Sequence, residues 1–152
     1  MSVPDFLDSN ILVYAYDASD PRKQRIAQDL VRRAVLGEMV ISTQVLAEFA
    51  ATLLHKLSPA APAHDVLALL DALDPIKVIS LDADTVRRAV AAHAEFGIHF
   101  YDGMIVAASE RAGCARILSE DLNPGQKFFG VLVENPFAKA PDADAPGGRH
   151  ET

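Results

Sequence analysis

The sequence predicts an α/β fold with a mostly parallel central sheet of about five strands and helices on both faces. Short apolar segments typical of buried strands alternate with longer segments whose apolar residues recur at helical spacing. Strands that alternate with helices are joined by right-handed crossovers, which make neighbouring strands parallel. The length of 152 residues fits one domain that buries a core without disulfides or a structural metal.

The first predicted strand, from about Val3 to Leu7, ends abruptly at Asp8-Ser9-Asn10, and a second apolar segment continues to Tyr16. This pattern is typical of a strand, a tight turn and a helix. It puts Asp8 at the carboxyl end of the strand, where α/β sheets bind their ligands. An isolated Asp-Ser-Asn would be explained more simply as a helix cap, so its meaning depends on the other acidic residues.

The next segments continue the alternation. Asp20-Pro21 begins a helix that ends at Gly37, and residues 39–41 form a short strand. Ser42-Thr43 caps a third helix with an apolar face, which puts Glu48 on its second turn.

A proline-containing loop follows at residues 58–62. The remaining predicted elements are helices at about 64–73, 82–96 and 101–111 and strands at 77–80, 116–118 and 131–133. From Lys139 onward the composition shifts to Ala, Pro, Asp and Gly without periodicity. Residues 1–138 are therefore predicted to form the domain and residues 139–152 a disordered tail.

Composition excludes several classes of protein. No apolar run is long enough to cross a bilayer and the N-terminus starts with a strand, so we expect a cytoplasmic protein with no membrane partner. Cys114 is the only cysteine, which excludes an internal disulfide and a cysteine-based zinc cluster. The net charge of -7 argues against binding a polyanion by bulk electrostatics, although carboxylates that hold divalent cations reverse the local field.

Four acidic residues occupy related positions. Asp8 and Asp121 follow apolar strands, Glu48 lies one turn into a helix, and Asp102 opens another helix. In a parallel sheet all four can converge on one edge. Carboxylates gathered in this way repel one another unless cations intervene, and hard oxygen ligands suit Mg²⁺ or Mn²⁺. Such an ion lowers the pKa of a bound water and stabilises charge on a phosphate, which indicates phosphodiester hydrolysis.

In order and spacing, the segments around these residues resemble the four acidic motifs of PIN-domain ribonucleases. The segments are Leu7-Asp8-Ser9-Asn10, Ala47-Glu48-Phe49, Tyr101-Asp102-Gly103-Met104-Ile105 and Leu118-Ser119-Glu120-Asp121-Leu122. The resemblance covers residues 3–135 and is greatest to the VapC toxins of type II toxin–antitoxin pairs. It implies a Mg²⁺-dependent endoribonuclease. The catalytic residues and metal ligands that it implies are Asp8, Glu48, Asp102 and Asp121.

The resemblance also implies supporting residues and partners. Ser9 and Ser119 match small hydroxyl positions near the metal and are assigned supporting hydrogen bonds. The fourth acidic position varies in the family, so Glu120 stays an alternative to Asp121. The implied partners are an RNA substrate, a cognate antitoxin whose arginine would enter the acidic pocket, and a second copy of the chain. The apolar helix faces at residues 45–54 and 66–73 also favour a homodimer.

Two alternatives stay open. The first is a PIN-like binding module with a vestigial acidic site. The second is another Mg²⁺-dependent phosphoryl-transfer or receiver-type domain. A receiver needs an Asp after its middle strand and a Lys after a late strand, whereas this chain has Ser80-Leu81-Asp82 and Glu134-Asn135-Pro136 there. His99, near Asp102, has no nucleophile motif beside it, and we interpret it as a loop residue.

Overall fold

The computed structural model describes residues 3–139, in which six strands form one central sheet. The strands are β1 (Asp5–Leu7), β2 (Met39–Ser42), β3 (Lys77–Ile79), β4 (Arg116–Leu118), β5 (Lys127–Phe128) and β6 (Val131–Glu134). The helices are α1 (Ser9–Tyr16), α2 (Pro21–Val35), α3 (Thr43–His55), α4 (Ala63–Ala72), α5 (Ala83–Phe96) and α6 (Phe100–Arg111). The predicted elements are all present, with bounds that agree to within two residues.

The sheet has the strand order β3-β2-β1-β4-β6-β5. All neighbouring strands are parallel except β5, which pairs antiparallel with β6. The mostly parallel sheet is as predicted, but the two-residue strand β5 adds a sixth strand at one edge. It forms because Phe129 and Gly130 both adopt positive φ angles, 50° and 84°, as a two-residue hairpin turn requires.

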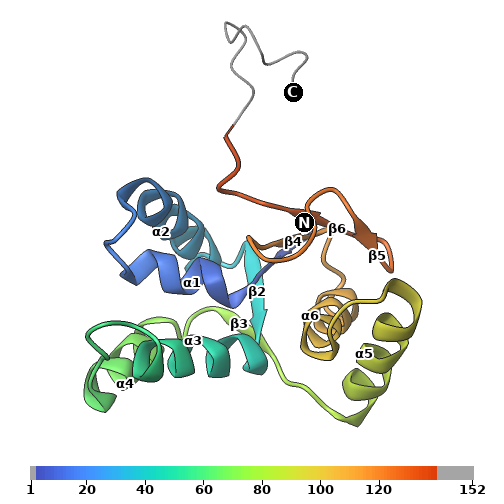
Figure 1. Ribbon diagram of the computed structural model, residues 1–152, viewed down its shortest axis with the longest axis horizontal. Coiled ribbons are helices and arrows are strands. Elements are labelled where there is room, and N and C mark those ends of the chain that lie inside the picture. The colour runs from blue at the N-terminus through green and yellow to red at the C-terminus, as the bar shows by residue number, and fades with distance from the viewer. Residues whose placement is uncertain (1–2, 140–152) are drawn as a thin grey trace, which may run out of the picture.

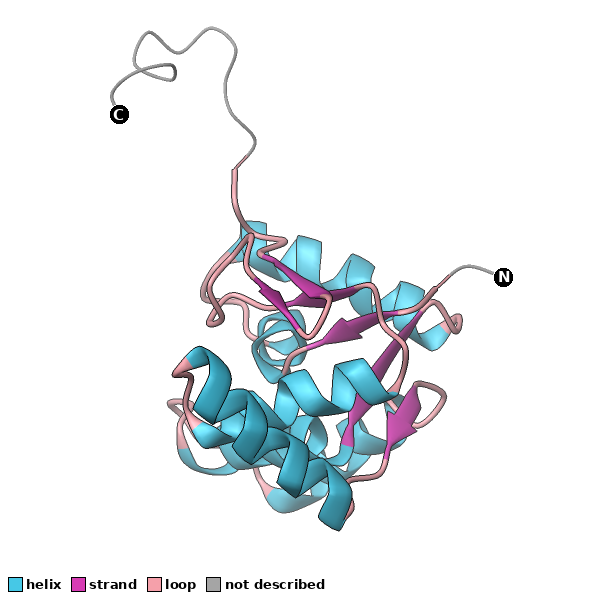
Figure 2. Ribbon diagram, turned by 90° about the vertical axis from the view of Figure 1, so that its right-hand side faces the viewer, coloured by secondary structure: helices cyan, strands magenta, loops and turns pink. Residues whose placement is uncertain are grey.

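Helices cover both faces of the sheet. Figure 1 shows α1 and α2 on one side of β2 and α5 and α6 on the other. Helix α1 packs against α2 and α3, while α6 packs against α5, β4 and β6. In the view turned by 90°, the strands form a layer between helices (Figure 2). Strands β1 and β2 are buried along their whole length, as expected for the middle of a sheet with two covered faces.

The helices that carry the predicted site residues all begin at polar caps. Asp8 caps α1 through the backbone N–H of Ser9, and Ser42 caps α3 through that of Val45. His99 caps α6, which agrees with its interpretation as a loop residue. Because α1 and α3 start directly after β1 and β2, their first turns lie at the carboxyl edge of the sheet.

Much of the apolar surface on α3 is used inside a single chain. Val45, Phe49 and Leu53 are buried in the core, whereas Leu67 on α4 is 62% exposed. Cys114 is a buried free thiol. Within residues 3–139, no helix is long and apolar enough to cross a membrane. Apart from Lys139, the predicted disordered tail lies outside the described residues.

Candidate active site

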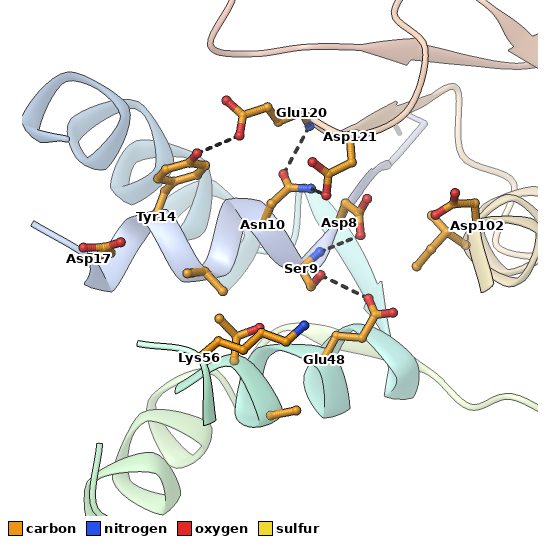
Figure 3. A pocket seen from close by; sticks show the side chains of 14 residues that line it. Asp8, Ser9, Asn10, Tyr14, Asp17, Glu48, Lys56, Asp102, Glu120 and Asp121 are labelled. Atoms are coloured by element: carbon orange, nitrogen blue, oxygen red, sulfur yellow. Dashed lines mark hydrogen bonds between the residues drawn. The ribbon is translucent and has the colours of Figure 1, made fainter. Parts of the chain in front are cut away.

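An open pocket of about 490 Å³ lies at the carboxyl edge of the sheet, between α1, α3, α6 and the segment after β4. All four acidic residues predicted from the sequence line it (Figure 3). Among residues 3–139, Asp17 and Glu120 bring the number of lining carboxylates to six, and Lys56 is the one basic lining residue. The fold therefore collects on one surface side chains that are up to 113 positions apart, from Asp8 to Asp121.

Asp8 is the most buried of these carboxylates, with 5% of its surface exposed. Its Oδ1 accepts a hydrogen bond from the Ser9 backbone N–H at 2.7 Å, and its Oδ2 accepts one from Ser119 Oγ at 2.7 Å. Burial raises the pKa of Asp8 to about 6, and the negative charges of Glu48 and Asp121 add to this effect. The two hydrogen bonds act in the opposite direction but do not cancel the loss of water.

Glu48 is half-buried on α3 and has a donor for each oxygen. Ser9 Oγ donates to Oε1 at 3.1 Å, and Gln44 Nε2 donates to Oε2 at 3.0 Å. The hydrogen bonds predicted for Ser9 and Ser119 are thus both present, to Glu48 and Asp8 respectively. They fix the orientation of two carboxylates that face the same pocket (Figure 3).

Asp121 and Glu120 turn in different directions. The exposed Asp121 carboxylate accepts a hydrogen bond from Asn10 Nδ2 at 3.2 Å. Glu120 accepts one from the Tyr14 hydroxyl at 2.7 Å and forms an ion pair with Lys23. Burial acts to raise the pKa of Glu120, but its bonds to Lys23 and Tyr14 lower it overall. Both residues line the pocket, but the Glu120 carboxylate is already paired with the ammonium group of Lys23.

Asp102 lies on the first turn of α6, on the opposite side of the pocket from α1. Burial raises its pKa, His99 acts against this shift, and the negative charges of Glu48 and Asp121 reinforce it. The raised pKa values of Asp8 and Asp102 share the same causes, desolvation and like charge. A positive charge bound in the pocket would lower the pKa values of both Asp8 and Asp102.

The chemistry of the donor set fits a hard divalent cation, because carboxylate oxygens from several elements face one solvent-open pocket. They do not form a ready-made ligand group. Among residues 3–139, no three His, Cys, Asp or Glu side chains are placed so that together they could hold a metal ion. Instead, hydroxyl and amide groups donate hydrogen bonds to Asp8 and Glu48.

The family model of the PIN domain matches residues 6–126, which include all four acidic segments. This chain belongs to the PIN-domain family. A comparison with curated proteins gave no match.

Solved structures show the same fold. The VapBC2 complex from Rickettsia felis, bound to a DNA fragment from its promoter, matches with a TM-score of 0.63 and 18% identity over 86% of this chain and 97% of that chain. A toxin–antitoxin complex from Klebsiella pneumoniae matches with a TM-score of 0.62 and 19% identity over 88% of this chain and 98% of that chain. VapC20 of Mycobacterium tuberculosis, a toxin that cleaves the sarcin–ricin loop, matches with a TM-score of 0.55 and 19% identity. The match covers 77% of this chain and 91% of that chain.

The pocket of this PIN domain also contains polar contacts that the sequence pattern does not single out. Asn10 holds the segment after β4: besides Asp121, its Nδ2 contacts Ser119 Oγ at 3.4 Å, and its Oδ1 accepts from the Glu120 N–H at 3.2 Å. Gln44 lies four residues before Glu48, a spacing that puts both on one helix face. That spacing is the one signal that could have identified Gln44.

Proposed function

We propose that this PIN domain is a Mg²⁺-dependent endoribonuclease, with Mn²⁺ as a substitute ion. The observation that carries the proposal is that Asp8, Glu48, Asp102 and Asp121, from four separate segments, line one pocket. The pKa values of Asp8 and Asp102 are raised mainly by burial, and the negative charges of Glu48 and Asp121 add to the shift, which agrees with several carboxylates facing one pocket. A hard cation would offset their charge and attract an RNA phosphate.

In this proposal Asp8, Glu48 and Asp102 hold the ion, and Asp121 contributes from the rim. Bound Mg²⁺ supplies a water of lowered pKa and positive charge for the phosphate that is attacked. Ser119 and Ser9 orient Asp8 and Glu48 through the hydrogen bonds described above. Glu120 is a poorer ligand than Asp121, because Lys23 and Tyr14 already engage its carboxylate.

In this proposal Lys56 contacts the RNA substrate. It extends along α3 toward Glu48 and, in the part of the chain that the structure describes, is the one basic side chain that lines the pocket (Figure 3). An ammonium group beside six carboxylates gives the RNA backbone a contact of opposite charge. Selectivity among RNAs would then come from the shape of the RNA and from partners, since such contacts do not distinguish bases.

The biological setting that we propose is that of a cytoplasmic toxin held by a cognate antitoxin. Two of the similar structures are toxin–antitoxin complexes, which supports this setting. A guanidinium from an antitoxin would pair bidentately with the pocket carboxylates and occupy the position of the cation. We also propose a homodimer, for which exposed apolar residues such as Leu67 on α4 and Val90 on α5 offer surface.

Light scattering tests the assembly. At micromolar concentration the chain alone should have the mass of a dimer, and the small protein encoded next to its gene should add to that mass. The added mass should decrease as Mg²⁺ increases, because the cation and the antitoxin arginine compete for the same carboxylates. A monomer would exclude the dimer, and binding that Mg²⁺ does not affect would place the antitoxin contact outside the pocket.

The nuclease is tested by RNA cleavage with Mg²⁺, with EDTA, and with EDTA followed by excess Mg²⁺. We expect cleavage that EDTA abolishes and Mg²⁺ or Mn²⁺ restores. Cleavage that persists in EDTA would refute the metal dependence. No cleavage under any of these conditions, by a protein that is folded and binds RNA, would favour a binding module with a vestigial site.

A further inference from the structure

Gln44 is a buried amide that lies behind the acidic pocket and contacts one of its lining carboxylates, Glu48. It lies on the first turn of α3 and has 9% of its surface exposed. Its Nε2 donates two hydrogen bonds, to Glu48 Oε2 at 3.0 Å and to the backbone carbonyl of Tyr101 at 3.1 Å. The second bond leaves α3 and reaches α6, next to Asp102.

The orientation of this amide is determined by its partners. A carboxylate oxygen and a carbonyl oxygen both accept hydrogen bonds, so only the NH₂ end of Gln44 can face them. The Oε1 end is left buried without a hydrogen-bond partner within residues 3–139. A buried acceptor without a donor lowers stability. Gln44 is therefore poorly explained as a residue that only stabilises the fold.

The link made by Gln44 joins parts of the pocket that are otherwise attached separately. Helix α6, which carries Asp102, packs mainly against α5, β4 and β6, whereas α3, which carries Glu48, packs mainly against α1, α4 and β2. Ser9 holds the other oxygen of Glu48 from α1. The Gln44 amide thus sets Glu48 relative to the backbone immediately before Asp102.

We propose that Gln44 is a positioning residue that sets the Glu48 carboxylate relative to Asp102 for binding a divalent cation. This inference rests on the proposed function, because it assigns Gln44 a role toward the same cation. Gln44 acts through hydrogen bonds to Glu48 and to the Tyr101 carbonyl, and it is not itself a ligand. Outer hydrogen-bond partners of metal ligands typically change metal affinity or activity by about 10- to 100-fold when they are lost.

The test is Gln44→Met, which keeps the length of the side chain and removes both donors. Gln28→Leu is the matched control, because Gln28 also bonds a backbone carbonyl on another helix, that of Ala15 at 3.1 Å, but does not bond Glu48 as Gln44 does. Titration calorimetry with Mn²⁺ should show affinity about tenfold or more weaker in Gln44→Met and unchanged in Gln28→Leu. The rate of RNA cleavage should fall through kcat, with KM for RNA unchanged.

A second series shows whether Gln44 acts through Glu48. In a Glu48→Ala background, Gln44→Met should weaken Mn²⁺ binding much less than it does in the wild type. Equal Mn²⁺ affinity of wild type and Gln44→Met would overturn the role of Gln44 while leaving the proposed nuclease intact. A wild-type protein that binds neither Mn²⁺ nor Mg²⁺ would overturn both.

NMR of the wild-type protein provides a measurement that does not depend on how well a variant folds. The side-chain NH₂ resonances of Gln44 should shift when Mg²⁺ is added, because Glu48 moves to bind the ion, and those of Gln28 should not. Gln44 resonances that stay in place at saturating Mg²⁺ would overturn the inference.

Discussion

Asp8 combines two roles that are alternatives when the sequence is read alone. It caps α1 through the Ser9 N–H, and the same carboxylate lines the acidic pocket and accepts a hydrogen bond from Ser119. The cap accounts for its position, but burial and neighbouring carboxylates keep its pKa well above the ordinary value of an aspartate. The fold therefore holds a charge at Asp8 that destabilises the protein when no cation is present.

The destabilising charge at Asp8 predicts that the effect of Asp8→Asn on stability depends on pH. The folded-state pKa of about 6 lies above the ordinary value of 3.8, so the folded state binds the proton more tightly than the unfolded state. Wild-type stability should therefore fall as pH rises from about 4 to 6. Asparagine also caps helices, so at neutral pH without metal the variant should be more stable by up to about 3 kcal/mol.

Urea unfolding in EDTA at pH 4 and pH 7.5 measures this difference. The two proteins should have similar stability at pH 4, where Asp8 is protonated, and diverge at pH 7.5. Asp71→Asn is the control, because Asp71 is exposed on α4 and does not line the pocket. A difference between wild type and Asp8→Asn that is the same at both pH values would contradict the burial of a charged Asp8.

The acidic residues could be predicted because each lies in a recognisable local pattern. The contacts of the Asn10 and Gln44 amides with distant segments could not: Asn10 contacts residues 119–121, and Gln44 contacts Tyr101. Neither contact leaves a periodic signal in the sequence. The ion pair between Glu120 and Lys23 in α2 likewise joins distant segments and could not be predicted from the sequence.

Among the elements, β5 is the one that the sequence did not predict. It has two residues, and its hairpin turn is Phe129-Gly130, with a phenylalanine at a positive φ angle where asparagine or aspartate is usual. The longer elements were predictable, because their apolar periodicity and polar caps agree. The sheet order follows less directly, since several parallel arrangements are compatible with the same alternation of strands and helices.

The pairing of α5 with α6 places a strict limit on Gly103, which follows Asp102. A Cβ at residue 103 would lie 2.6 Å from the carbonyl oxygen of Ala89 on α5, and that backbone atom cannot move without the helix. Gly103→Ala should therefore push the two helices apart, lower the free energy of unfolding by about 1 to 3 kcal/mol, and displace Asp102 from the pocket.

Urea unfolding and RNA cleavage together check the Gly103 prediction. Both stability and cleavage should decrease in Gly103→Ala, because small displacements of catalytic groups can lower rates by about 100-fold. Ala94→Ser, which adds one atom to an exposed position of α5, should change neither. Wild-type stability in Gly103→Ala would show that the two helices are not held at this distance.

For the whole molecule, the distribution of charge carries more information than its sum. A net charge of -7 by itself argues against RNA as a ligand, yet six of the acidic side chains line one pocket. The parallel sheet explains this concentration, because consecutive strands end at the same edge. The sequence could therefore predict where the four acidic side chains gather, whereas the side-chain contacts among them depended on the packing of α1, α3 and α6.

The proposal that the acidic pocket is the catalytic site is tested most directly by comparing RNA cleavage in Mg²⁺ by wild type, Asp102→Asn and Asp71→Asn. Asparagine keeps the shape of residue 102 and removes its charge, so the variant should stay folded. We expect Asp102→Asn to lose cleavage and Asp71→Asn to retain the wild-type rate. Cleavage at the wild-type rate by a folded Asp102→Asn would contradict the claim that this acidic pocket is the catalytic site.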